Sequence, residues 1–286
     1  MAFGSKYETL GKSIVRQVYP KRKITSRKGD FGRVLVIGGN QMFSGAPSFV
    51  GMAALKSGCD LSIIAAPKRS ADIAATYSPD LITVPLEGKY LSTTHLKKLR
   101  EIKCDCVVIG NGLGRLDATK RAVRFILKQI EKPFVIDGDA IHSIIEDIDS
   151  IKGKEIVFTP HKTEFNLLSG LKLTNDLDEN VKHVIEFSKK YKSVIVLKGN
   201  TDIISNGEKI LLNKTGNPFM TKGGTGDILA GITGGLLARK VSAFDAACCA
   251  TFLTGLAGDI AAKEYQDSTT ASDILNNIYK AIKDVK

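Results

Sequence analysis

The chain of 286 residues contains no tryptophan, and its aromatic content is only 7%. Its apolar runs, such as residues 34–37 and 194–197, are far shorter than the roughly 20 residues that a membrane-spanning helix needs. Residues 1–17 are polar and lack the charged, apolar and small-residue parts of a secretory signal. These absences predict a cytoplasmic protein with no membrane partner.

Cysteine pairs with metal or redox spacing are also absent. None of the five cysteines stands in a C-x-x-C pair, which argues against zinc or redox chemistry and favours buried thiols. The net charge of +11 indicates an anionic partner. Because the basic residues are scattered and no aromatic–basic platform occurs, a polyphosphate ligand explains this charge as well as a nucleic acid does.

Two nucleotide-binding signatures are missing. The chain has no G-x-x-x-x-G-K-[ST] segment, which excludes a P-loop nucleotidase. Gly110-Asn111-Gly112-Leu113-Gly114 is similar to the start of a dinucleotide fingerprint, but Asp117 stands where the third spaced glycine would fall. A backbone that a ligand must approach closely is the better interpretation of these glycines.

Short β-branched runs alternate with helical patterns along the chain. This alternation predicts a single α/β domain over residues 1–286, with three α/β/α layers and a mainly parallel central sheet. Residues 1–32 are expected to form a basic N-terminal arm, and Asn206-Gly207 predicts a hairpin. Strands are expected at 33–37, 61–65, 106–109, 134–136, 155–158, 194–197, 202–205 and 209–212, and helices at 47–57, 93–101, 118–129, 178–190, 225–238, 243–263 and 270–282.

Polar or glycine-rich turns follow several of the expected strands. Ligands of open α/β sheets bind beyond the carboxyl ends of the strands, so these turns predict one shared crevice. Turns with a purely structural role would also use glycine, but they would not need acidic, histidine and lysine side chains. The side chains concerned are Asp137, Asp139, His161, Lys198 and Asp202.

The most informative segment is Thr221–Gly231, in which glycines and threonines lead into an acid and an apolar helical pattern. Free N–H groups and the dipole at such a helix N-terminus can hold a phosphate. Asp227 would lie in the first turn, beside this anion site. Its task would be to take a proton from a hydroxyl that attacks a phosphoryl group. The alternative is an acid that only caps the helix.

Two other segments have both structural and functional interpretations. His161, followed by Glu164 three residues later, would open a helix after a Thr-Pro turn. His161 suits contact with a substrate and Glu164 suits a hydrated metal or phosphate oxygen, while the alternative for Glu164 is a partner of the helix dipole. Lys198, at a strand end, would meet a nucleotide phosphate or remain a solvated surface lysine.

Together these motifs resemble the ribokinase-like superfamily, whose members carry a G-x-G-D turn that serves as anion hole and base; Gly224-Thr225-Gly226-Asp227 matches it. Within that superfamily the chain is similar to the ADP- or ATP-dependent NAD(P)H-hydrate dehydratases over about residues 25–265. The matching segments are Lys28–Gly39, Ser44–Pro47, Gly110–Gly114, Asp137–Ala140, Thr159–Glu164, Leu197–Gly199 and Asn213–Gly231.

The resemblance implies a ribokinase-like fold and a lyase that repairs the nicotinamide cofactor. The hydrate of NADH or NADPH would be phosphorylated by ADP or ATP, and the phosphate ester would then eliminate. Asp227 would be the catalytic base, and the hydrate would contact Ala46, Gly112, Gly114, His161 and Asp227. The nucleotide would be bound by Lys198, Gly199, Asn200, Thr201, Asp202, Gly224, Thr225 and Gly226, and Glu164 would help to place Mg²⁺.

The resemblance also bears on partners. It implies NADH or NADPH hydrate and an adenine nucleotide as ligands, no nucleic acid, and a homo-oligomer, for example a tetramer. Many relatives carry an epimerase domain, but an arm of 32 residues is shorter than the roughly 50 residues of a small domain. We therefore expect no epimerase domain, and a separate epimerase or spontaneous exchange for the other epimer.

Two competing hypotheses stay open at this stage. A small-molecule kinase of the hydroxyethylthiazole or hydroxymethylpyrimidine type would use the same turn and base but would leave a stable phosphate ester. A basic nucleotide- or nucleic-acid-binding module without catalysis would bind in a strongly salt-dependent way and would not need Asp227.

Overall fold

The computed structural model describes residues 6–285 and has within them one nine-stranded sheet. The strand order is β3-β2-β1-β4-β5-β6-β7-β8-β9, with parallel pairing as far as β7 and antiparallel pairing of β8 and β9. The predicted mainly parallel sheet and the hairpin at Asn206-Gly207 are confirmed. The strands are β1 (Arg33–Ile37), β2 (Leu61–Pro67), β3 (Leu81–Leu86), β4 (Cys106–Ile109), β5 (Phe134–Ile136), β6 (Ile156–Phe158), β7 (Val194–Leu197), β8 (Asp202–Ser205) and β9 (Ile210–Asn213).

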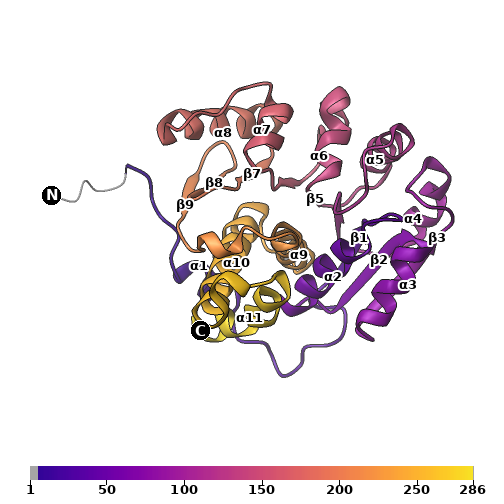
Figure 1. The fold of residues 1–286 in the computed structure, drawn as a ribbon, viewed down its shortest axis with the longest axis horizontal. Helices are drawn as coiled ribbons and strands as arrows, with labels where there is room; N and C mark the ends of the chain where they lie inside the picture. The colour runs from indigo at the N-terminus through magenta and orange to yellow at the C-terminus, as the bar shows by residue number, and fades with distance from the viewer. Residues whose placement is uncertain (1–5, 286) are drawn as a thin grey trace.

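Helices cover both faces of the sheet (Figure 1). In β1, Val34 and Val36 join one apolar core and Leu35 and Ile37 join the other, because successive side chains of a strand point to opposite faces. The first core includes residues of α1 (Ser13–Val18), α2 (Gly45–Lys56), α3 (Lys68–Tyr77), α9 (Thr225–Ala238), α10 (Ala243–Tyr265) and α11 (Ala271–Lys283). The second includes residues of α4 (Leu96–Glu101), α5 (Asp117–Gln129), α6 (Asp139–Ile144), α7 (Lys162–Ser169) and α8 (Leu177–Tyr191). The expected three α/β/α layers are therefore present.

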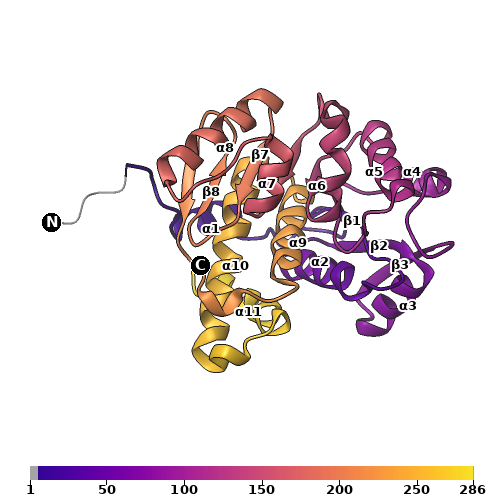
Figure 2. The same ribbon diagram turned by 45° about the horizontal axis from the view of Figure 1, so that its top comes forward.

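Helix α9, which carries Asp227, packs closely on its neighbours. A Cβ atom at Gly231 would overlap the carbonyl oxygen of Val50 on α2, and one at Gly234 would overlap Val108 on β4. Glycine at these positions therefore lets α9 approach both elements. Figures 1 and 2 show α9 between α2 and α10, which it contacts on either side. This packing fixes the start of α9 above the carboxyl ends of the central strands.

The described part of the N-terminal arm, residues 6–32, packs against the domain. Helix α1 contacts α10, and Thr9 forms a bridge with Leu212 of β9. The guanidinium of Arg239 lies 4.5 Å from the ring centroid of Tyr19, which anchors the segment after α1. Residues 1–5 of the predicted arm lie outside the described residues.

Helix α10 belongs to the apolar segment that is long and hydrophobic enough to suit a membrane span. However, 72% of its most apolar window is buried inside the protein, as expected for a core helix. All five cysteines are buried and free, which confirms the prediction of buried thiols.

Candidate active site

A cleft of about 460 Å³ opens at the carboxyl edge of the sheet. Asp227 lines it together with Gly112, from the turn after β4, and Ala46, from the start of α2. The other lining residues are Met42, Phe43, Ser44, Gly45, Phe49, Asp139, Gly223 and Gly224. The structure thus brings Ala46, Gly112, Gly224 and Asp227 together in one cleft.

The start of α9 has the geometry of an anion site. Asp227 lies in its first turn, where N–H groups have no partner inside the helix. Gly224 is the N-cap residue with φ of 101°, and a Cβ there would lie 2.8 Å from the Cβ of Ala271. Only glycine satisfies both conditions. The positive end of the helix dipole therefore faces the cleft beside a carboxyl group.

The next two residues of this turn are also tightly placed. A Cβ at Gly226 would lie 3.3 Å from Nζ of Lys198, so the backbone of the turn passes directly beside this ammonium group. Thr225 Oγ1 donates to the carbonyl oxygen of Met220 at 3.0 Å, which holds the preceding loop in place. Backbone N–H groups, a helix dipole and a lysine thus converge, as phosphate binding requires.

One buried amide connects Asp227 with a second carboxylate. Nδ2 of Asn111 donates to Oδ1 of Asp227 at 2.6 Å and to Oδ2 of Asp137 at 2.9 Å. The other oxygen of Asp137 accepts from Oγ1 of Thr159 at 2.7 Å and from Nζ of Lys198 at 3.1 Å. Because these partners follow the adjacent strands β4, β5, β6 and β7, the parallel sheet itself brings them together.

The charges of this network set the protonation of the site. Burial and the negative charge of Asp137 raise the pKa of Asp227 to about 7, although donation from Asn111 and the charge of Lys198 oppose the rise. Burial alone would lower the pKa of Lys198, but Asp137 and Glu164 outweigh it and hold that pKa above its ordinary value. The site therefore combines a carboxyl group that titrates near neutral pH with a permanent cation, which suits general-base catalysis on a phosphorylated ligand.

His161 and Glu164 begin α7. Nδ1 of His161 accepts from the N–H of Glu164 at 3.2 Å, and Oε2 of Glu164 accepts from the N–H of His161 at 2.9 Å. The structural interpretation of Glu164 at a helix start is therefore present in the structure. His161 also forms a backbone bridge with Lys198, and 54% of its side chain is exposed. It is accessible to a ligand that approaches Lys198.

The turn after β7 is shaped by Asp202. Its Oδ1 accepts from the N–H of Gly199 and its Oδ2 from Nδ2 of Asn213, each at 3.0 Å. Asn200 is exposed and Thr201 is half-buried in the same turn. Asp202 thus orders the loop that begins at Lys198.

Gly114 lies beside the cleft rather than in its lining. Its N–H donates to Oδ2 of Asp139 at 2.8 Å, and Nε of Arg115 donates to Oδ1 of the same carboxylate at 2.8 Å. Gly114 therefore helps to hold the carboxylate of Asp139, which itself lines the cleft.

Sequence reasoning assigned no role to Asn111, Met42 or Phe43. Asn111 is the one polar side chain in the turn of residues 110–114, and that contrast is the signal that would have revealed it. Met42 and Phe43 are 76% and 54% exposed although they are large and apolar. Exposed apolar residues next to a glycine-rich turn indicate a surface for a ligand.

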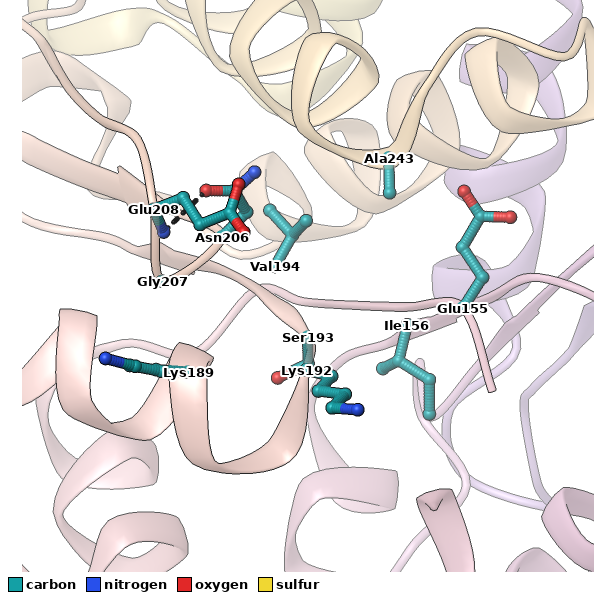
Figure 3. A pocket seen from close by; sticks show the side chains of 10 residues that line it. All are labelled: Glu155, Ile156, Lys189, Lys192, Ser193, Val194, Asn206, Gly207, Glu208 and Ala243. Atoms are coloured by element: carbon teal, nitrogen blue, oxygen red, sulfur yellow. Dashed lines mark hydrogen bonds between the residues drawn. The ribbon is translucent and has the colours of Figure 1, made fainter. Parts of the chain in front are cut away.

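A second hollow of about 460 Å³ lies at the opposite edge of the sheet, at the amino ends of β6 and β7 (Figure 3). Lys189 and Lys192 line it on one side and Glu155 on the other. None of the expected site residues lines this hollow. The cleft at the carboxyl edge is therefore the candidate active site.

The fold and the glycine-rich turn ahead of Asp227 define a protein of the ribokinase-like class. The chain superposes on a ribokinase-like superfamily protein from Enterococcus faecalis V583 with a TM-score of 0.87 and 27% identity, covering 100% of this chain and 98% of that one. It has the same fold as the ADP/ATP-dependent NAD(P)H-hydrate dehydratase from Bacillus subtilis, with a TM-score of 0.84, 23% identity, and coverage of 99% and 100%.

Within that class, the chain belongs to the NAD(P)H-hydrate dehydratase family, whose family model matches residues 34–280. It is 41% identical over 267 residues to the bifunctional NAD(P)H-hydrate repair enzyme Nnr of Pyrobaculum aerophilum, covering 92% of this chain and 52% of that enzyme. It is 36% identical over 277 residues to the ADP-dependent (S)-NAD(P)H-hydrate dehydratase of Cenarchaeum symbiosum, covering 96% of both. The chain thus spans about half the length of the bifunctional relatives.

Proposed function

We propose that this protein dehydrates the hydrate of NADH or NADPH, with an adenine nucleotide as the phosphoryl donor. The observation that carries the proposal is the position of the Asp227 carboxyl group, which lies in the first turn of α9 and is hydrogen-bonded to Asn111. Burial there raises its pKa to about 7, as a general base needs. Membership of the hydrate dehydratase family supports the same substrate.

The reaction follows from this arrangement. Asp227 accepts the proton of the hydrate's hydroxyl while that oxygen forms a bond to the terminal phosphorus of the nucleotide, whose bridging P–O bond breaks. The N–H groups of Gly224–Gly226 and the ammonium of Lys198 stabilise the charge on the phosphoryl oxygens. The phosphate ester then loses inorganic phosphate and a proton from the neighbouring ring carbon, which restores the double bond.

The binding roles divide between the cleft and the turn after β7, whose Lys198 lies beside Gly226. We assign the hydrate to Ala46, Gly112, Gly114 through Asp139, and His161, and the nucleotide to Lys198, Gly199, Asn200, Thr201, Asp202, Gly224, Thr225 and Gly226. Two relatives match over almost their whole length, one from Cenarchaeum symbiosum and one from Nitrosopumilus maritimus. Both are ADP-dependent dehydratases, which favours ADP as the donor.

The acidic residues fit a Mg²⁺ ion that arrives with the nucleotide. Among residues 6–285, no group of three or more histidine, cysteine or acidic side chains could hold a metal by itself. Mg²⁺ commonly binds one or two carboxylates together with phosphates and water. Glu164, whose carboxylate charge acts on Lys198, is the residue that would hold the hydrated ion. When bound, the ion would neutralise charge on the phosphates.

The direct test is incubation of the protein with NADH hydrate and either ADP or ATP, while the absorbance of reduced nicotinamide is followed. Recovery of the absorbance with release of inorganic phosphate is expected, and Asp227→Asn should bind nucleotide but lose several orders of magnitude in rate. No recovery with either nucleotide, together with phosphorylation of a thiazole or pyrimidine alcohol, would identify a kinase instead. Salt-dependent binding of nucleic acid that Asp227→Asn leaves unchanged would identify a binding module.

A homo-oligomeric state, a cytoplasmic location and a functional partnership with an epimerase remain predictions. The bifunctional relatives pair a region similar to this chain with a further half of comparable length, which supports the partnership. Sedimentation analysis tests the first prediction. Addition of an epimerase to a mixture of both hydrate epimers tests the last, because it should raise the yield of restored cofactor.

A further inference from the structure

We propose that Asn111 is a positioning residue, which fixes the carboxyl group of Asp227 in the cleft through one amide that it shares with Asp137. This inference rests on the proposed function, because a base must be held against the hydroxyl that it deprotonates. The amide is hydrogen-bonded to two carboxyl groups, and of these only Asp227 lines the cleft, so the effect of the amide on the reaction passes through Asp227.

The hydrogen-bond geometry determines the orientation of the amide. Its two Nδ2 protons go to Asp227, 2.6 Å away, and to Asp137, 2.9 Å away. The opposite orientation would set Oδ1 of Asn111 against two carboxylate oxygens, which is repulsive. Because Asn111 is only 2% exposed, water does not substitute for either contact. Both carboxyl groups are therefore tied to the same rigid point at the end of β4.

The backbone around Asn111 is built for this placement. Gly110 and Gly112, on either side, have φ values of 129° and 70°, which favour glycine. A Cβ at Gly110 would also overlap the carbonyl oxygen of Asp137. The turn therefore brings Asn111 against the end of β5, where only a glycine neighbour leaves room.

The acceptor of the amide indicates a role other than stability. Oδ1 of Asn111 is buried and has no hydrogen-bond partner among the described residues. A buried acceptor without a partner lowers the stability of the fold. An amide is nevertheless present at this position. Its contribution is the pair of hydrogen bonds that it donates to Asp227 and Asp137.

Charged groups approach Asp227 from several elements, and the amide acts within their field. Asp137 at the end of β5 disfavours a second negative charge, and Lys198 at the end of β7 favours it. Asp139, at the start of α6, lines the same cleft, and Glu164 on α7 acts on Lys198. The α2 residues in the cleft lining are uncharged. Loss of the amide donor should therefore raise the pKa of Asp227, and loss of the Asp137 charge should lower it.

The experiment compares the pH dependence of kcat in wild-type protein, Asn111→Leu, Asn111→Ala and Asp137→Asn. In the Asn111 variants the acid limb of the profile should move up by one to two pH units, since a hydrogen bond to a charged group is worth about that much. In Asp137→Asn the limb should move down. The KM for the hydrate should change far less than kcat. Asn277→Ala removes a buried amide of α11 that does not line the cleft, and it should leave the limb in place.

A second readout does not need turnover. The ¹³C carboxyl signal of Asp227, assigned by its absence in Asp227→Asn, should titrate at higher pH in Asn111→Leu and at lower pH in Asp137→Asn. If the wild-type protein fails to act on the hydrate, the proposed function is wrong and this titration still decides the role of Asn111. The inference would be overturned if the acid limb of kcat and the pKa of the Asp227 signal stayed unchanged in Asn111→Leu and Asp137→Asn. It would also be overturned if they moved in the same direction in these two variants.

Discussion

Replacement of Asp227 by asparagine should stabilise the fold above neutral pH while it removes activity. The reason is that burial and the charge of Asp137 raise the pKa of this carboxyl group to about 7, so that it stays protonated in the folded protein below that pH. In the unfolded chain the same group ionises near its ordinary value of 3.8. The unfolded state therefore releases this proton at a lower pH than the folded state does.

The sign and size of the effect follow from this difference. Between about pH 4 and pH 7 the folded state binds the extra proton, so the stability that Asp227 contributes at low pH is lost as the pH rises, and the loss is complete above about pH 7. A pKa change from 3.8 to about 7 corresponds to ~4 kcal/mol if the charge were fully shielded from water. Because Asp227 is half-buried and faces an open cleft, roughly half of this, about 2 kcal/mol, is expected.

The assay is urea unfolding of wild type and Asp227→Asn at a series of pH values, followed by circular dichroism because the chain has no tryptophan. The difference in unfolding free energy should grow as the pH rises towards 7 and then level off in favour of the variant. Asp245→Asn removes an acid from the first turn of α10 together with its hydrogen bonds from Ser242 and Gln17, and it shows what the loss of such an acid at a helix start does. A difference that is the same at all pH values would refute the reasoning.

Three further variants test the cleft. Phe43→Ala should raise the KM for the hydrate about tenfold, the effect of roughly 1.4 kcal/mol of lost contact, whereas Phe125→Ala, which removes a ring of similar exposure on α5, should leave KM unchanged. Gly226→Ala should weaken nucleotide binding at least about tenfold, measured by calorimetry, because the methyl group would lie 3.3 Å from Nζ of Lys198. Gly224→Ala should instead lower the unfolding free energy by about 1–3 kcal/mol, because it combines a positive φ with contacts near 3 Å; unaltered stability would contradict this.

The fold was predictable where elements are buried on both sides. The central strands carry apolar runs, and five of the nine strands described begin and end at the residues expected from the sequence. Edge strand β3 (Leu81–Leu86) was not expected; Pro85 lies within it, and a proline in a strand pattern argues against a central strand. The helix expected at 93–101 begins with a 3₁₀ turn, Thr93–His95, and α4 starts only at Leu96. Nδ1 of His95 accepts from the N–H of Ser92 at the start of this turn.

The site was predictable only where its signal is local. Asp227 follows a glycine-rich turn within a few residues, so sequence alone pointed to it. The role of Asn111 depends on contacts with Asp137 and Asp227, which are 26 and 116 residues away in the chain. The capping contacts of Glu164 and the loop-ordering role of Asp202 likewise follow from the folded geometry.

The strands whose ends carry the hydrogen-bond network of Asn111, Asp137, Thr159 and Lys198 lie away from both edges of the sheet. β4, β5, β6 and β7 are flanked by β3-β2-β1 on one side and β8-β9 on the other. Local opening of a protein is easiest at its least-packed borders. The end strands can therefore open and exchange their amide hydrogens without breaking the contacts between Asn111 and the two carboxyl groups. Substitutions that loosen β3 should accelerate hydrogen exchange in that strand well before they impair turnover.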